Sequence, residues 1–172
     1  VVFCSSSNDV SPLYFSEMKI LAKGLAKKNV EVVYSGARVG LMGELANSTL
    51  EAGGRIKGVI PEYLNKPGIV HEGLTELEIV DNLLDRKRAM LKACDGVIAF
   101  PGGVGTIDEI TEVMALKQLG EYKGPIFFIN FLDSWSMLLE FFEELKVRAM
   151  ISQPLDQLYQ VFPSSEELME HI

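Results

Sequence analysis

The segment GVIAFPGGVGTIDE, residues 96–109, joins an apolar run to a stretch with helical periodicity. Its opening GVIAF is apolar on both faces, which is typical of a strand at the centre of a parallel sheet. Pro101 and three glycines follow, and after them come a threonine and two acidic residues. This order predicts a strand, a tight turn and then a helix, which we expect to run from Ile107 to about Leu119.

The alternation of short strands and longer helices continues on both sides of this segment. It predicts β–α units around a parallel sheet, and therefore an α/β fold. The stretch from Glu62 to Gly73 has little periodicity, so we expect a surface loop there. The expected strands are 1–4, 30–35, 55–61, 75–80, 96–100, 125–130 and 158–162, and the other expected helices are Pro12–Lys28, Gly40–Ala52, Asn82–Cys94, Ser134–Ala149 and 164–172.

Length and charge narrow the class of protein. With 172 residues the chain can bury a core of its own, so we expect residues 1–172 to form a single domain. The net charge of −8 would repel a phosphate backbone, so nucleic acid is not an expected partner. No apolar stretch approaches the roughly 20 residues that span a bilayer, so no membrane partner is expected either.

Cysteines and histidines are few. Cys4 and Cys94 lie in segments that we expect to be buried, and two cysteines do not make a disulfide framework, so we expect a cytoplasmic protein. His71 and His171 are far apart in sequence and poorly accompanied, so no metal site is expected.

Three loops are rich in small residues, and they begin after Cys4, after Ser35 and after Phe100. A parallel sheet brings such loops together at the carboxyl ends of its strands. Each loop leads into a helix whose free N–H groups favour an anion, so we expect a phosphate site. In the third loop we expect the glycines to adopt positive φ and to leave room for the phosphate. The alternative is a tight turn in which Thr106 only caps the helix.

The charged residues near the third loop leave two interpretations open. Asp108 and Glu109 either stabilise the helix dipole or face sugar hydroxyls or an attacking water. Arg86, Lys87 and Arg88 form either a solvated helix face or a contact for an anionic ligand. Spacing alone does not separate these interpretations.

The expected helix at 134–149 has more apolar faces than a lone surface helix needs. We therefore expect a homodimer. The side chains expected in the core or at the subunit contact are Trp135, Leu138, Leu139, Phe141 and Phe142.

Several segments resemble one known family. PGGVGTIDE, residues 101–109, resembles the PGGxGTxxE signature of the Lonely Guy proteins, the cytokinin riboside 5′-monophosphate phosphoribohydrolases. RKRAM, residues 86–90, lies where that family carries its Arg-Lys pair. The segments VGLMG, GLTEL and QLGEYKGP are similar to it as well, so the likeness covers nearly the whole chain in the same order.

The resemblance implies a Rossmann-like, doubly wound parallel sheet with helices on both faces, assembled as a homodimer. It implies a hydrolase that cleaves the N-glycosidic bond of AMP or an N6-modified relative to a free base and ribose 5-phosphate, without metal or redox cofactor. It makes Arg86 and Glu109 the catalytic pair, with Glu109 at the sugar and water and Arg86 on the phosphate or leaving-group side. The substrate contacts expected with them are Lys87, Gly102, Gly103, Val104, Gly105, Thr106, Asp108, Ser6, Gly40, Met42 and Gly43.

Some positions depart from the family's pattern, which leaves the base preference and the strength of the activity open. A glutamate that contacts the base in many members is missing near Gly68. The other departures are Ser5, Ser35 and Ala37 at usual glycines, Leu83 at a common methionine and Val104 at a frequent tyrosine.

Three other functions compete with this interpretation. The first is a non-catalytic carrier of a nucleotide or of a molybdenum cofactor, because such carriers have the same fold. The second is a lysine decarboxylase, a label often given to this family, but pyridoxal phosphate needs a Schiff-base lysine for which the sequence offers no convincing context. The third, a purely structural dimerisation module, does not explain three small-residue loops that converge at one sheet edge.

Overall fold

Strands and helices alternate along the chain in the computed structural model, which describes residues 1–92 and 94–172. The strands are β1 (Val2–Phe3), β2 (Val32–Tyr34), β3 (Ile56–Pro61), β4 (Glu76–Val80), β5 (Val97–Ala99), β6 (Ile126–Ile129) and β7 (Gln160–Phe162). The helices are α1 (Pro12–Lys27), α2 (Gly40–Glu51), α3 (Leu83–Lys92), α4 (Val104–Gln118), α5 (Ser136–Val147), α6 (Leu155–Leu158) and α7 (Ser165–His171), with 3₁₀ turns η1 (Glu62–Leu64) and η2 (Phe131–Asp133).

All strand pairs in these ladders are parallel. One ladder has the order β4-β3-β2 and the other has the order β1-β5-β6-β7. β1 contacts β2, but within the described residues no ladder joins them. The chain therefore winds outward from β1 to β4 on one side and then returns to β5 on the other, which makes β1 the point where the winding reverses.

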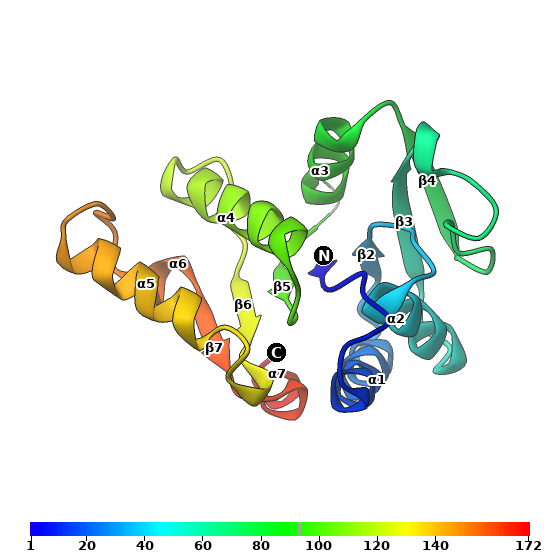
Figure 1. Ribbon diagram of the computed structural model, residues 1–172, viewed down its shortest axis with the longest axis horizontal. Helices are drawn as coiled ribbons and strands as arrows, with labels where there is room; N and C mark the ends of the chain where they lie inside the picture. Colours follow the sequence, from blue (N-terminus) through cyan, green and yellow to red (C-terminus); the bar gives the residue numbers. More distant parts are fainter. Residues whose placement is uncertain (93) are drawn as a thin grey trace.

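Helices cover both faces of the strands (Figure 1). In β6, Phe127 and Ile129 pack with α1, α2 and α7, whereas Ile126 and Phe128 pack with α3 to α6. This alternation follows from the period of two along a strand, and it requires apolar residues at every position. The α/β fold expected from the sequence, doubly wound with helices on both faces, is confirmed.

α1 is a long helix with a well-defined start. Pro12 stands in its first turn, and the Ser11 hydroxyl accepts a hydrogen bond of 3.4 Å from the N–H of Leu13. Its apolar stripe is broad, and it packs against α2 and α7. The buried residues of α1 are Glu17, Met18, Leu21, Ala22, Leu25 and Ala26.

Several element ends differ from the expected ones. α3 corresponds to the expected helix Asn82–Cys94, of which residue 93 lies outside the described residues. α6 takes in Leu158, so β7 begins two residues later than the strand expected at 158–162. α4 begins at Val104 rather than at Ile107, because the turn after β5 is complete within Pro101 to Gly103.

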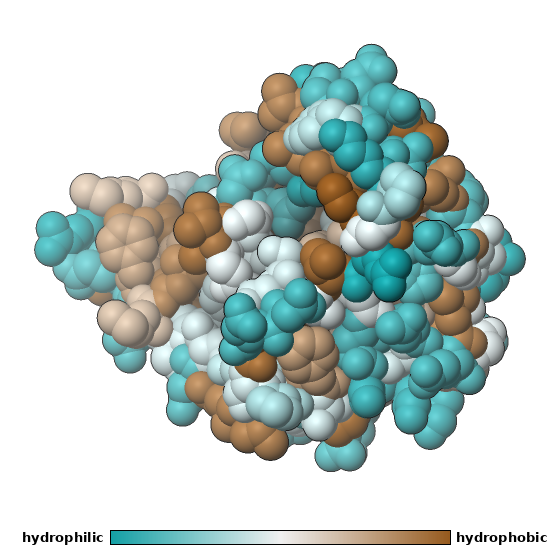
Figure 2. Space-filling view, turned by 45° about the vertical axis from the view of Figure 1, so that its right-hand side comes forward, coloured by the Kyte–Doolittle hydropathy of each residue, from teal (hydrophilic) through white to brown (hydrophobic). Residues whose placement is uncertain are grey.

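Two of the aromatic side chains that we expected in the core or at a subunit contact belong to the core of the same chain. Trp135 and Phe142 are buried, Trp135 packs edge-on against Phe128, and Phe142 packs against Tyr159. Hydrophobic side chains interrupt the hydrophilic surface in several separate places (Figure 2). No helix within the described residues has both the length and the apolar character needed to cross a membrane.

Candidate active site

A cavity of about 370 Å³ opens at the carboxyl ends of β1, β2 and β5. This is the position that the reversal of the winding at β1 predicts for a ligand site. Residues from three loops and from α3 share its wall. The lining residues are Val2, Phe3, Cys4, Ser5, Ser6, Ser7, Ser35, Met42, Arg86, Gly103, Val104, Gly105, Thr106 and Glu109.

The N-terminus of α4 forms one side of the cavity. Gly103 is the residue that caps the helix, and no side chain accepts a hydrogen bond at this end. The N–H of Ile107 donates to the Gly103 carbonyl over 3.0 Å, so the N–H groups of the three residues before it precede the first bond of the helix. Together with the positive end of the helix dipole, they make this wall suited to an anion.

The glycines of this loop differ from the expected ones in their backbone conformation. Positive φ was expected there, but Gly102, Gly103 and Gly105 are not among the glycines with positive φ. A Cβ on Gly102 would collide with the side chain of Thr106, whereas a Cβ on Gly103 or Gly105 would meet no atom within 4 Å. Gly102 therefore allows close packing, and the other two keep the cavity open. Thr106 is buried inside the first turn and is not the cap.

Arg86 and Glu109 meet in the cavity although they are 23 residues apart. The Nη2 of Arg86 donates to Oε1 of Glu109 over 2.6 Å, and the two side chains are 16% and 10% exposed. Burial raises the pKa of Glu109 above its ordinary value, and the charge of Arg86 offsets this only in part. Within the described residues the buried Nε of Arg86 has no hydrogen-bond partner, so it is a donor available to a ligand.

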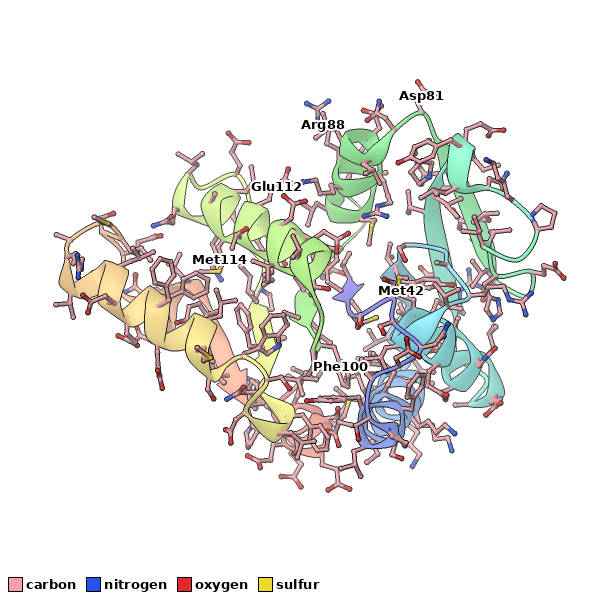
Figure 3. All side chains as sticks on the ribbon, in the orientation of Figure 1. Met42, Asp81, Arg88, Phe100, Glu112 and Met114 are labelled. Atoms are coloured by element: carbon pink, nitrogen blue, oxygen red, sulfur yellow. The ribbon has the colours of Figure 1, made fainter. Side chains whose placement is uncertain are left out.

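Lys87 and Asp108 form a second ion pair beside the first, outside the cavity wall. The Nζ of Lys87 lies 3.0 Å from Oδ2 of Asp108 and also contacts the carboxylate of Glu112. Figure 3 places Glu112 on α4, toward α3. Burial of the Lys87 ammonium opposes its charge, but the hydrogen bonds to Glu112 and Asp108 outweigh this and raise its pKa. Lys87 is thus held as a cation between two acids.

The structure brings together most, but not all, of the residues that the sequence nominated. Arg86, Glu109, Ser6, Met42, Gly103, Val104, Gly105 and Thr106 line the cavity. Lys87, Asp108, Gly40, Gly43 and Gly102 do not.

Two of these glycines connect the loops that surround the cavity. Gly40 has φ +56, and a Cβ on it would collide with the backbone of Ser6 and Ser7. A Cβ on Gly43 would collide with the backbone carbonyl of Arg38. The N–H of Gly40 also donates to the Asn8 side chain over 2.8 Å. Gly40 therefore allows the first two loops to pack closely, and Gly43 allows close packing within the second loop, although neither lines the cavity.

Sequence reasoning did not nominate Cys4 or Ser35 as ligand contacts, although both line the cavity. Cys4 is buried, and burial raises the pKa of its thiol, with the nearby charge of Glu109 adding to the effect. The Ser35 hydroxyl donates to Sδ of Met42 over 2.7 Å. Their signal in the sequence was their place at the last residue of a strand, where side chains reach the ligand edge.

No cluster of metal-ligating side chains occurs within the described part of the chain. The hydrogen-bonding and charged groups of the cavity are serine and threonine hydroxyls, one thiol, backbone N–H groups and the Arg86–Glu109 pair.

Comparisons with known proteins agree with this geometry. The family model described as "Possible lysine decarboxylase" matches residues 42–172. A cytokinin riboside 5′-monophosphate phosphoribohydrolase of Rhodococcoides fascians is 38% identical over 88% of this chain and 77% of its own length. A probable enzyme of the same name from Oryza sativa subsp. japonica is 33% identical over 99% of this chain and 81% of its own length.

The solved structures add a likeness in fold. The molybdenum cofactor carrier protein of Chlamydomonas reinhardtii superposes with a TM-score of 0.75 at 18% identity, over 99% of this chain and 92% of that one. At this level of identity the likeness concerns the fold alone.

Proposed function

The chain belongs to the Lonely Guy family, that of its relatives from R. fascians and rice, and from this membership we propose that it hydrolyses purine nucleoside 5′-monophosphates. The bond cleaved is the N-glycosidic bond, and the products are a free base and ribose 5-phosphate. AMP and N6-modified AMP are the proposed substrates. The observation that carries the proposal is the Arg86–Glu109 pair of 2.6 Å, which lines the same cavity as the open N-terminus of α4.

The N-terminus of α4 is the proposed binding site of the phosphate. Its free N–H groups and dipole offer partial positive charge, and Gly103 and Gly105 leave the approach unobstructed. Ser6 and its neighbours in the first loop add hydroxyl donors to the lining of the same cavity. A phosphate held here would place the attached ribose toward Arg86 and Glu109.

Glu109 is proposed to act on the ribose. As the bond to the base breaks, positive charge develops on the sugar, and a carboxylate beside it stabilises that charge or orients the attacking water. Arg86 supplies donors to the phosphate or to the leaving base, and its unpartnered Nε suits either. No step of this chemistry calls for a metal or a redox cofactor.

Lysine decarboxylation, which the name of the family model suggests, fits this site less well. A Schiff base requires a neutral lysine next to the cofactor. The lysine adjacent to the site, Lys87, is paired with Asp108 and Glu112, and its pKa is raised.

We also propose that the whole chain acts as one domain that pairs with a second copy in the cytoplasm. On α5, Met137 is 86% exposed and Phe141 is 56% exposed. Side chains of this size and polarity favour a subunit contact. The two cysteines are free, which agrees with a reducing compartment.

Incubation with AMP and with N6-modified AMP tests the proposed activity. We expect free base and ribose 5-phosphate in equal amounts, measured by chromatography. The variant that tests the role of the carboxylate is Glu109→Gln, which keeps the shape of the side chain but removes its charge. It is expected to lower kcat by about a hundredfold or more while the nucleotide still binds. Tight binding of AMP by the unaltered protein without any release of base would instead indicate a carrier.

A further inference from the structure

We propose that Lys87, Asp108 and Glu112 form a positioning network that fixes α3 against α4 and thereby sets the orientation and the charge of Glu109. The kinetic part of this inference rests on the proposed function. None of the three residues lines the cavity, so the proposal gives them no direct contact with the substrate.

The network and the catalytic pair are adjacent on both helices. On α3, Arg86 is followed directly by Lys87, and on α4, Asp108 directly precedes Glu109. Two parallel connections therefore join the helices, Arg86 to Glu109 over 2.6 Å and Lys87 to Asp108 over 3.0 Å. Glu112 adds a further contact to Lys87 one turn along α4. A shift of α3 that broke one connection would also displace the other.

Apolar packing alone holds α3 weakly. Met90 is its one buried residue, while Leu83 is 44% exposed and Leu84 is 62% exposed. Its backbone lies close to β3 and β4, at the edge of the sheet, and its side chains reach α4 through the ion pairs. The position of Arg86 relative to Glu109 therefore depends on these charged contacts.

Charges from each element packed around Glu109 act on it in opposite directions. From α3, Arg86 and Lys87 favour its ionised form and lower its pKa. From α4, Asp108 opposes ionisation and raises its pKa. Glu112 faces Lys87, and Cys4 at the end of β1 stays a neutral thiol because burial raises its pKa. Lys87 and Asp108 are partners in one ion pair, yet their effects on Glu109 have opposite signs.

The opposite effects of Lys87 and Asp108 on the pKa of Glu109 distinguish a positioning network from a simple structural contact. Lys87→Met removes a positive charge, so Glu109 should ionise only at higher pH. Asp108→Asn removes a negative charge, so Glu109 should ionise at lower pH. Both substitutions break the Lys87–Asp108 pair, and Lys87→Met also breaks the contact with Glu112, so a loss of contacts alone gives no reason for shifts of opposite sign. Lys87→Arg keeps the charge and is the matched control, expected to titrate like the unaltered protein.

The titration of Glu109 itself is the direct test. The carboxyl carbons of ¹³C-labelled glutamate are followed by NMR between pH 3 and 8, roughly the range in which carboxyl groups titrate. The signal missing from Glu109→Gln identifies the residue. Shifts of opposite sign in Lys87→Met and Asp108→Asn would support the proposal. Shifts of the same sign, or none in either variant, would overturn it. Because no substrate is needed, this result stands even if the proposed activity is absent.

Kinetics supply the second test. The kcat for AMP, which reports the ionisation of the bound complex, should fall at low pH as Glu109 becomes protonated. On the acid side, Lys87→Met is expected to lower kcat about two- to fivefold, the size of a partly exposed ion pair, while KM changes little. A rise in KM with unchanged kcat would instead make Lys87 a substrate contact and contradict the proposal.

Discussion

α1 and α3 both connect strands of the same sheet, but they are attached to the protein in different ways. α1 has 16 residues, buries six of them and packs against α2 and α7. α3 has 10 residues, buries only Met90 and reaches α4 through ion pairs. In Figure 1, α1 lies under the strands, whereas α3 stands apart between β4 and α4.

The two kinds of attachment serve different properties: apolar burial of α1 serves the stability of the fold, and the ion pairs of α3 serve the geometry of the site. Apolar burial is non-directional and tolerates water and salt outside the core. Ion pairs are directional and depend on pH and ionic strength, so they suit a helix that must present Arg86 at a defined place. The helix that supports the fold is thus distinct from the helix that supports the site, and the two should respond to different perturbations.

Truncating one buried side chain on each helix should produce the largest effect. Leu21→Ala on α1 and Met90→Ala on α3 both remove a fully buried side chain, and each is expected to cost about 2–5 kcal/mol of unfolding free energy, measured with denaturant. Only Met90→Ala should also reduce kcat at a temperature where both variants are folded, because α3 loses its one buried apolar side chain. Equal kcat values in the two variants would remove the distinction between the helices.

Glu17 is a polar exception on α1 and should give an intermediate effect. Its side chain is buried, and Oε1 accepts a hydrogen bond of 2.5 Å from the N–H of Ser165 at the start of α7. Glu17→Ala leaves that buried donor without a partner and is expected to lower the free energy of unfolding by about 1–3 kcal/mol. The midpoint of thermal unfolding measures the loss. A change within error would mean that solvent replaces the contact.

Salt should have the smallest effect, and it should act on α3 alone. Asp108 is 65% exposed, so 1 M NaCl is expected to weaken its pair with Lys87 by at most about 1 kcal/mol. Amide hydrogen exchange should become faster along α3 and stay unchanged along α1. Arg88→Ala is the control, because Arg88 is 80% exposed, pairs among the described residues only with Asp85 of its own helix, and points away from the site (Figure 3). Faster exchange along α1 would contradict the comparison.

The sequence predicts the fold well because its signal is local. GVIAF becomes β5 because apolar residues on both faces have no other stable place than the middle of a sheet. The edge at which the three loops meet follows from the parallel order of the strands. Arg86 and Glu109 were paired only through the resemblance, since their separation of 23 residues carries no local signal.

The structural roles of individual residues were harder to predict, because they depend on neighbours that are distant in sequence. Gly102 is required by Thr106, and Gly40 by the backbone of the first loop. The expectation of positive φ in the third loop was wrong because those glycines accommodate packing and open space instead. Lys87 follows Arg86 in the motif, and only the three-dimensional arrangement shows that it faces two acids.

Within the described residues no ladder joins β1 to β2, and the cavity lies at this junction between the two halves of the sheet. The cavity wall extends to Val2 and Phe3 of β1 and also includes Ser35 just beyond β2. A nucleotide in contact with both loops would connect the two halves of the sheet across this junction. Part of its binding free energy would then stiffen this junction, and we expect the backbone of β1 and β2 to gain protection from amide exchange beyond the atoms that the ligand touches.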